Sequence, residues 1–587
     1  MSPEDFSGVV VIVRIGGGPI MDNKLRSFSL LALAAGASLL AGSFLAGSPA
    51  RALEPVSLES GSNSITLSVA GTYRGGFFSN DTPATPPAYD PVTKRLFVGS
   101  GDRKAIDVID ISDPARPARL APIDIVAYGG EPKGLALHKG IIAATIENES
   151  GADQVVLFNA NGERVTDPIL LADANRVAFS PNGRRLVVTM YGSLTDNCSR
   201  DPNASIAIIE LGSVNWGGCR QGAGKCNVSP SVRTAGFTAF NGKKDELIAA
   251  GARFYGPDPN ITVAQDANPE GLAISADSRF AWVTLERNNA IAKVDLNAAK
   301  VTDIYPLGSR DHSLPGQGFD ASDKDGGVNI KPWPVRSFYS PDGIAVVGGG
   351  RQTYLVTADE GDPKDGECGY GEKFRLKDLV LDETAFPDRV TLQKNENLGR
   401  LAVTNASGDT DNDGDLDEIY MLGSRSFSVW TSDGQLVFNS GDAFEQITAQ
   451  AVPAHFNAAE DENALDARSD DRGPEPEHLA VGEVDGRDYL FVGFERIGGF
   501  VVYDITDPTK PVFQQYINNR DFGVDPRTSC GQKGTPELAG CAAVGDLEPE
   551  GFVFIPKQDS PVDVPLLAVI HELSDSTTIY RIEKTAN

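Results

Sequence analysis

Short apolar runs separated by turn residues recur along most of the chain. In each copy a Pro/Gly turn opens into an apolar run, a second turn follows, and another apolar run begins. Five clear copies start at Pro132-Lys-Gly, Pro269-Glu-Gly, Pro341-Asp-Gly, Pro476-Glu-His and Pro549-Glu-Gly, and two looser copies span 91–99 and 175–189. Short strands at regular spacing, with no helical period between them, predict an all-β fold.

Most units add a third apolar run, at 105–111, 155–159, 204–211, 290–296, 426–431, 499–505 and 577–582. A four-stranded unit repeated radially is a propeller blade, and the sequence contains seven such units. The last unit reaches the C-terminus after its third run, so we expect residues 64–74 to supply its fourth strand and close the ring. The sequence therefore predicts a seven-bladed β-propeller. An eight-bladed ring and a pair of sandwiches are the alternatives.

The first 52 residues are set apart from this pattern. Residues 1–20 read as a mis-assigned start, because Met21 begins a better one. Residues 21–52 have a basic flank, an apolar run and a small-residue exit at Ala50-Arg-Ala52, which predict a secretory signal peptide and a mature chain from Leu53. A membrane anchor is the alternative, and no later stretch is apolar enough to span a bilayer.

Residues 53–587 are interpreted as one propeller domain. Three long insertions break its rhythm, near 195–234, 361–417 and 441–473. Connections of this length in a compact fold usually carry function or lack order.

The charge balance narrows the choice of partners. The formal net charge is −29, from 52 basic and 81 acidic residues. Nucleic acids and anionic membranes require a basic face, so neither is expected as a partner. We also expect the protein to be a monomer. The acidity suits bound divalent cations, although a solubility surface would look the same.

The six cysteines fit an oxidising compartment and, with the signal peptide, predict a periplasmic or secreted protein. Cys530 and Cys541 share one loop and predict a disulfide. One pair is expected among Cys198, Cys219 and Cys226, while Cys368 stands alone in an acidic loop.

Acidic residues recur at two places in the repeat. Five glutamates follow the second strand of a unit, namely Glu147, Glu286, Glu360, Glu495 and Glu572, and four acids stand in the opening turn, namely Glu270, Asp342, Glu477 and Glu550. The first strand of a blade lines the channel, so these carboxylates should meet near the axis, where they repel unless protonated or bridged by cations. Hard oxygen ligands suit calcium or magnesium. We therefore predict an axial cation cluster, with a second divalent or iron-type metal as an option; acids that merely cap turns are the alternative.

One loop has the spacing of a calcium site. Carboxylates alternate with other residues, and a glycine bends the chain, in the run Asp409, Asp411, Asp413, Gly414, Asp415 and Asp417. This is how a short loop wraps one Ca²⁺. The twelfth position is Tyr420 rather than the glutamate of an EF-hand, so we predict an EF-like calcium loop that leads into a strand.

Two stretches place arginine beside acids and a hydroxyl. They are Arg310-Asp-His312-Ser with the following 320–325, and Arg468-Ser-Asp-Asp-Arg472. A guanidinium can contact two oxygens of a phosphate or sulfate. Our hypothesis is that Arg310 or Arg468 steadies a phosphoryl group and His312 protonates the leaving oxygen, with surface ion pairing as the alternative. The five histidines lack zinc spacing.

The stretches Asp311–Ile330, Arg425–Gly441 and Arg468–Phe522 resemble the bacterial choice-of-anchor I family, which is similar to the mesenchyme-specific cell-surface glycoproteins linked to biomineralisation. The resemblance covers nearly the whole mature chain. It implies a secreted or surface propeller, and many bacterial members are described as alkaline-phosphatase-like. Members often carry a C-terminal sorting tail, which is absent after Ile582, so a soluble periplasmic or released form is expected.

The expected function is thus metal-dependent hydrolysis of phosphate esters at alkaline pH by a calcium-binding propeller. The alternative is a non-catalytic, calcium-stabilised protein that binds a surface or mineral.

Overall fold

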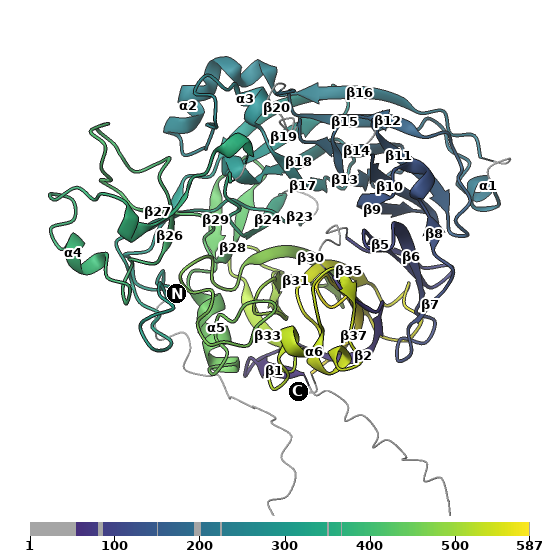
Figure 1. The fold of residues 1–587 in the computed structure, drawn as a ribbon. Coiled ribbons are helices and arrows are strands. Elements are labelled where there is room, and N and C mark those ends of the chain that lie inside the picture. The colour runs from purple at the N-terminus through teal and green to yellow at the C-terminus, as the bar shows by residue number, and fades with distance from the viewer. Residues whose placement is uncertain are drawn as a thin grey trace, which may run out of the picture.

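The computed structural model describes residues 55–79, 86–148, 151–192, 201–222, 226–348, 352–365 and 367–585. The predicted start (1–20) and signal peptide (21–52) lie outside these residues. The sheets stand around a central axis (Figure 1). In the described chain, seven sheets have four or five strands. Their innermost strands contact one another in turn around the axis, and the last contacts the first. The predicted β-propeller is therefore confirmed.

From the innermost strand outward, the sheets are β4 (Ala88–Asp90), β5 (Arg95–Ser100), β6 (Ala105–Asp110) and β7 (Ala118–Arg119), with β8 (Ile123–Asp124) also on β6; β9 (Glu131–His138), β10 (Ile141–Glu147), β11 (Asp153–Asn159) and β12 (Ile169–Leu171); β13 (Ala174–Phe179), β14 (Arg185–Met190), β15 (Ser205–Glu210) and β16 (Ser231–Gly236); β17 (Pro269–Ile274), β18 (Phe280–Leu285), β19 (Ala290–Asp295) and β20 (Lys300–Pro306). They continue with β23 (Ile344–Val347), β24 (Tyr354–Asp359), β28 (Ser426–Thr431) and β29 (Leu436–Asn439); β30 (Pro476–Val484), β31 (Arg487–Phe494), β32 (Phe500–Asp504), β33 (Val512–Asn518) and β1 (Val56–Glu59); and β35 (Pro549–Ile555), β36 (Leu566–His571), β37 (Ser576–Lys584) and β2 (Ile65–Arg74).

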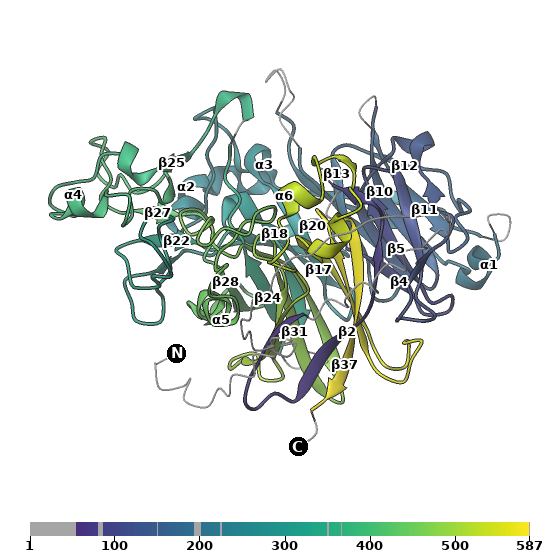
Figure 2. The same cartoon turned by 60° about the horizontal axis from the view of Figure 1, so that its bottom comes forward.

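The N-terminal segment closes the ring. Strand β2 pairs antiparallel along β37, from Ile65 opposite Lys584 to Arg74 opposite Ser576, and the two strands lie side by side in Figure 2. This confirms the expectation that residues 64–74 supply the outer strand of the last sheet. Strand β1 also pairs with β33, so the same segment joins two neighbouring sheets, which the sequence did not indicate.

The core lies between neighbouring sheets. Ile206 and Ile208 of β15, for example, belong to one buried cluster with Val283 of β18 and Val294 of β19. The middle strands read as nearly continuous apolar runs because both faces of each sheet are covered.

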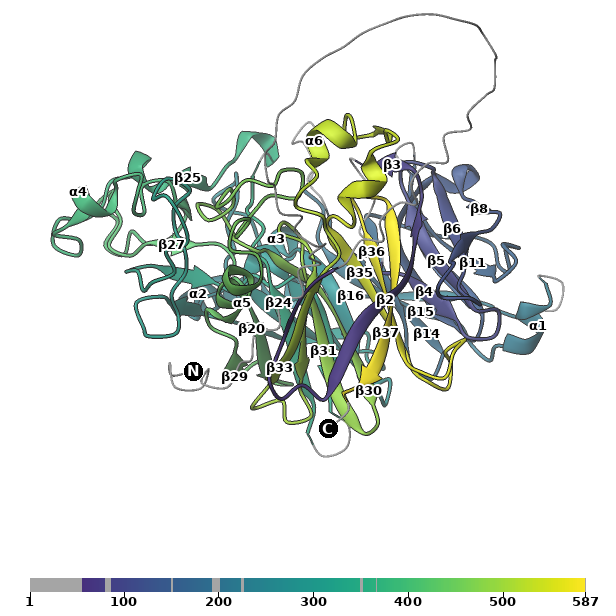
Figure 3. The same ribbon diagram turned by 90° about the horizontal axis from the view of Figure 1, so that it is seen from below.

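Inserted segments project from opposite sides of the ring and over one of its ends (Figure 3). They contain the helices α1 (Trp216–Arg220), α2 (Lys244–Ala249), α3 (Val263–Asp266), α4 (Arg389–Leu392), α5 (Ala443–Ala451) and α6 (Pro526–Ser529), and the short strands β3 (Phe77–Phe78), β21 (Ser309–Asp311), β22 (Arg336–Phe338), β25 (Lys373–Arg375), β26 (Ala402–Thr404), β27 (Tyr420–Met421) and β34 (Thr535–Pro536). The segments around β22, β26 and α4 share their own buried cluster, which includes Phe319, Leu392 and Leu416. No helix in the described ranges is both long and apolar enough to cross a membrane.

Two disulfides join described residues, Cys530 to Cys541 and Cys219 to Cys226. Both match the predictions, and Cys198 lies outside the described residues. The prediction that Cys368 stands alone is wrong, because Cys368 is also disulfide-bonded.

Candidate functional site

The charged residues of the repeat sit in β-bulges of the innermost strands. Two residues oppose one at Asn175-Arg176, Glu270-Gly271 and Glu477-His478, and the register also shifts at Lys133 and Glu550. A bulge leaves a residue unpaired and re-aims its side chain. The recurring acids and bases can therefore leave their sheets at the same level of the axis.

A glycine follows several of these charged residues because the innermost strands approach one another closely there. A Cβ on Gly271 would lie 2.3 Å from the carbonyl oxygen of Asp342 in the next sheet, and a Cβ on Gly343 would lie 2.6 Å from that of Glu477. The Thr284 hydroxyl completes the contact, since it donates to the Asp342 carbonyl oxygen at 2.8 Å. The Glu-Gly and Asp-Gly pairs thus set the spacing of carboxylates around the axis.

We expect Gly271→Ala to lower the free energy of unfolding by on the order of 1–3 kcal/mol, because the added methyl forces neighbouring backbone apart. Urea denaturation of the two purified proteins measures the change. The matched control is Gly242→Ala, where a Cβ meets nothing within 4 Å. Equal stability of both variants would show that the strand contact at Gly271 yields without cost.

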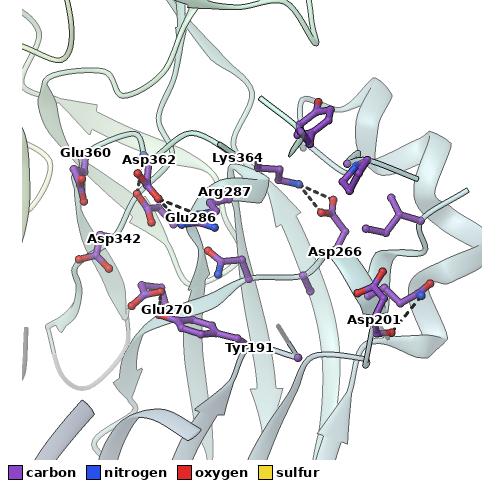
Figure 4. A pocket seen from close by; sticks show the side chains of 18 of the residues that line it. Tyr191, Asp201, Asp266, Glu270, Glu286, Arg287, Asp342, Glu360, Asp362 and Lys364 are labelled. Atoms are coloured by element: carbon purple, nitrogen blue, oxygen red, sulfur yellow. Dashed lines mark hydrogen bonds and ion pairs between the residues drawn. The ribbon is translucent and has the colours of Figure 1, made fainter. Parts of the chain in front are cut away.

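A cavity of about 420 Å³ lies beside the bulged parts of the innermost strands. Five carboxylates gather at one end of it, Glu270, Glu286, Asp342, Glu360 and Asp362 (Figure 4), and Glu477 also lines it. At the other end Lys364 Nζ binds both oxygens of Asp266, at 2.6 and 2.7 Å. Sequence-predicted acids from three different sheets therefore share one wall.

Burial and mutual repulsion make these carboxyls hard to ionise. Burial, followed by the nearby Glu360 and Asp362, raises the pKa of Glu286 well above its usual range. Burial and Glu270 do the same to the pKa of Asp342, and burial and Glu550 to that of Glu477. Burial raises the pKa of Glu360 to about 7, although Arg472 opposes this. Near neutral pH we therefore expect these four carboxyls to hold protons or to bind cations.

Arginines compensate another part of the cluster. Glu475 accepts from Arg468 and lies 3.0 Å from Arg472 and 2.8 Å from Arg496, measured between the charged atoms. Burial alone would raise the pKa of Glu475, but these three guanidinium groups hold it well below its usual range. Arg468, predicted as a phosphate ligand, is thus engaged by Glu475 rather than exposed to the cavity.

Three glutamates of the cluster keep oxygens without a partner. Glu477 Oε2, Glu495 Oε2 and Glu550 Oε2 are buried and accept no hydrogen bond. Glu495 and Glu550 are 8% and 5% exposed. A buried acceptor without a donor is costly, so these oxygens are suited to a cation or a proton.

Four of the predicted acids do not line this cavity: Glu495 and Glu550 adjoin its carboxylates, whereas Glu147 and Glu572 lie apart. Glu147 pairs with Lys133 at 2.7 Å, and Lys133 also binds Glu131 at 2.7 Å. Glu572 is half-buried and its backbone N–H donates to the carbonyl oxygen of Glu548, outside the lining of the cavity.

Arg176 and Tyr191 line the cavity and were not singled out from the sequence. The Arg176 guanidinium lies 3.6 Å from Glu270 and 3.1 Å from His478 Nε2, and the Tyr191 hydroxyl donates to Glu270. The strand pairing aligns Ala174-Asn175-Arg176-Val with Pro269-Glu270-Gly271-Leu. This looser unit therefore has Asn175 in place of the acid and Arg176 in place of the glycine.

His312 and Arg310 are buried away from the cavity. His312 is 0% exposed, and its ring nitrogens contact the Gln317 carbonyl oxygen at 2.6 Å and the Ser337 hydroxyl at 2.8 Å. Arg310 donates to Gln317 Oε1 and to the Ser424 carbonyl oxygen. Burial, followed by the charge of Arg310, holds the pKa of His312 well below its usual range. These groups join the insertions to the propeller, and neither lines the cavity.

The EF-like loop is exposed and folds around its own backbone. Carboxylate oxygens of Asp409, Asp411 and Asp417 lie within 4.8 Å of one another, as do those of Asp382, Asp415 and Asp417. Asp409 accepts from the backbone N–H of Asn412 at 2.6 Å and of Gly414 at 3.1 Å. Asp413 accepts from the backbone N–H of Asp415. Gly414 has φ +101°, which provides the expected bend.

Comparison with known proteins gives three findings. A family model described as the choice-of-anchor I domain matches residues 86–508. The mesenchyme-specific cell surface glycoprotein of Strongylocentrotus purpuratus is 29% identical over 301 residues, and gigasin-3a of Magallana gigas is 28% identical over 204 residues. The aligned parts cover 45% and 34% of this chain, and 38% and 69% of those two proteins.

Among solved structures, the β-propeller domain of Cps50 (Swd1) from Myceliophteria thermophila is similar in fold. Its TM-score is 0.39 and its identity 8%, with 88% of this chain and 99% of that chain covered.

Proposed function

This chain belongs to the choice-of-anchor I domain family, and from that premise we propose that it is an extracellular or surface protein whose axial carboxylates bind divalent cations of the calcium type and hydrolyse phosphate esters with their help. The proposal also includes export to the periplasm or medium after removal of residues 21–52. The disulfides and the cell-surface name of one relative support this location.

The buried oxygens without partners carry the proposal. Glu477, Glu495 and Glu550 each keep one such oxygen, and the adjoining cavity wall adds Glu270, Asp342 and Glu360. Calcium takes six to eight oxygen ligands at flexible geometry, which suits carboxylates arriving from several sheets. These residues would hold the cation.

A cation held there supplies Lewis-acid polarisation of a phosphoryl oxygen. The chain's own contribution is Arg176, whose guanidinium faces the same cavity and can contact two phosphate oxygens. Asn175 Nδ2 donates to Glu270 at 3.0 Å, and this orients the carboxylate beside the arginine. Arg176 replaces Arg310 and Arg468 in our assignment, because those two are engaged elsewhere.

Hydrolysis of a chromogenic phosphate ester tests the function. The mature protein is assayed from pH 7 to 10, first after chelation and then with calcium, magnesium, manganese or zinc restored. We expect turnover only with metal. Absence of turnover under all these conditions would reject the catalytic part of the proposal. The binding part is tested separately, by calorimetric titration of the protein with calcium.

A second candidate is cation binding without hydrolysis. It is favoured by the absence of histidine from the lining of the cavity in the described chain, and by Lys364, which is held by Asp266 and by the carbonyl oxygen of Tyr255 at 3.0 Å. Neither a histidine nor a free lysine in the lining is then at hand to protonate a poor leaving group. Esters with good leaving groups should be hydrolysed faster if the first function is right.

We also propose the loop 409–417 as a structural calcium site. In calcium, Asp411→Ala with Asp413→Ala should lower Tm by on the order of 3 °C when the free ion is ~100-fold above Kd, and should change little in chelator, because only the folded loop binds the ion. Differential scanning calorimetry with and without chelator measures this.

The matched control replaces two exposed acids on α2, Asp245→Ala with Glu246→Ala. It should retain the full calcium-induced rise in Tm. The same rise in the loop variant would exclude the loop as a calcium site.

A further inference from the structure

The axis carries one imidazole that breaks the repeat. The residue at this place is glycine at Gly134, Gly271, Gly343 and Gly551, but Arg176 in strand β13 and His478 in strand β30. Gly493 of the second strand opposes the Glu477-His478 bulge. A Cβ on Gly493 would lie 2.8 Å from the Phe552 ring.

Other sheets show the reverse arrangement. Thr284 opposes the Glu270-Gly271 bulge, and Thr145 pairs with Gly134. In the sheet of β30 the second strand has a glycine, Gly493, at this place, and the innermost strand has the large side chain of His478. His478 thus projects where four of its counterparts are glycine, and it lines a smaller cavity of about 110 Å³ among innermost strands of several sheets.

The ring faces two carboxylates without bonding to either. His478 Nδ1 lies 3.5 Å from Glu477 Oε1 and 3.5 Å from Glu550 Oε2. His478 is 8% exposed, and Nδ1, Glu477 Oε2 and Glu550 Oε2 all lack a hydrogen-bond partner. A buried nitrogen therefore lies beside one oxygen of each of two carboxylates, and each of these carboxylates keeps a buried oxygen without a partner.

We propose that His478, Glu477 and Glu550 bind one transition-metal dication of the zinc, manganese or ferrous class. The inference rests on the proposed function, since it assigns the metal class of one part of the same axial centre. The carboxylates of Glu270, Glu286 and Glu360 offer only oxygen ligands, and we assign them to a hard cation.

The separations match a shared metal. Nitrogen and oxygen ligands bind such ions at about 2.0–2.2 Å, so two ligands at tetrahedral angles lie about 3.4 Å apart. The 3.5 Å distances from Nδ1 to both carboxylates are this spacing. Imidazole favours zinc, copper, iron or nickel over calcium, which prefers oxygen at 2.3–2.6 Å.

The other ring nitrogen has a suitable second contact. Nε2 lies 3.6 Å from Asp342 Oδ2, and in the structure it contacts Arg176 Nη2 at 3.1 Å. When Nδ1 binds a metal, Nε2 carries the proton and needs an acceptor, which Asp342 provides as in carboxylate–histidine–metal triads. Arg176 is then expected to turn toward Glu270 and the larger cavity.

The alternative occupant of this space is a proton carried by Glu477 or Glu550. Cobalt(II) distinguishes the two. The chelator-treated mature protein is titrated with Co²⁺ in excess calcium, and visible absorption and bound metal are measured. We expect about one Co²⁺ per chain with a visible band, and binding at least ~100-fold weaker in His478→Gln. The control His138→Gln, in which the lost imidazole contacts Phe179 and Trp216, should bind as the parent does.

A measurement on the parent protein covers the case in which His478→Gln does not fold. Proton NMR of the Co²⁺-loaded parent should show a paramagnetically shifted, exchangeable imidazole N–H, which Nε2 would supply. Absence of this resonance, absence of Co²⁺ binding in excess calcium, or unchanged Co²⁺ affinity in a folded His478→Gln variant would overturn the inference. If calcium-supported hydrolysis persists in that case, only this assignment fails; if calcium binding is lost as well, the proposed function fails with it.

Discussion

Replacing Glu270 and Glu550 together by glutamine is expected to abolish metal-dependent hydrolysis, lowering kcat by at least ~100-fold, and to reduce the bound calcium. The two residues occupy the same position of the repeat in the innermost strands β17 and β35. Glutamine keeps the shape of the side chain and one acceptor oxygen, so the side chain at position 270 can still accept a hydrogen bond from the Asn175 amide. The negative charge that attracts the cation is gone.

The same variant should be as stable in chelator as the parent, or more so. Removing buried carboxylates that repel their neighbours relieves an electrostatic cost that only the cation offsets. A control with two highly exposed acids changed, Asp167→Asn with Asp563→Asn, should keep both metal and rate. Metal analysis and steady-state kinetics on the three proteins decide the matter. Full metal content and full rate in the double glutamine variant would show that these acids are only turn residues.

In chelator, the free energy of unfolding is expected to fall as pH rises from 5 to 8. Burial raises the pKa of Glu286, Asp342 and Glu477 well above their usual range, and that of Glu360 to about 7. In the unfolded chain these groups lose their protons near pH ~4. Between the two ranges the folded state holds more protons than the unfolded state, so increasing pH removes stability.

The size of this loss is on the order of a few kcal/mol, because each pKa unit corresponds to ~1.4 kcal/mol per group. Calcium should remove most of it by replacing the protons. Urea denaturation at pH 5, 6, 7 and 8, with calcium or with chelator, gives the slope. The double glutamine variant should have a shallower slope in chelator than the exposed-acid control. Identical slopes in calcium and in chelator would contradict an axial cation site.

Much of the fold could be predicted from the sequence. Alternating apolar runs and Pro/Gly turns are local signals, and each sheet is built from consecutive strands, so the pattern was sufficient for the propeller. The closing strand followed from the missing partner of β37. The recurring acids could also be located near the axis, because equivalent positions of a radial repeat share a level.

The partners of those acids could not be predicted in this way. Arg472 comes from the insertion before β30 and reaches Glu360, which follows β24, through tertiary packing, whereas Arg468 pairs with Glu475, which is close to it in the chain. Arg310 and His312 looked chemical in the sequence, yet packing buried them between insertions and propeller. Pairings between segments far apart in the chain leave no local pattern.

The sequence by itself determined the strands, their order and the level at which carboxylates meet, because these depend on local periodicity and on a repeated turn. Only the tertiary structure decided which acids are matched by arginine and which buried oxygens stay without a partner. It also placed Arg176 and His478 beside those oxygens. The physical reason is that charge compensation and desolvation depend on neighbours in space, and those neighbours come from different sheets and insertions.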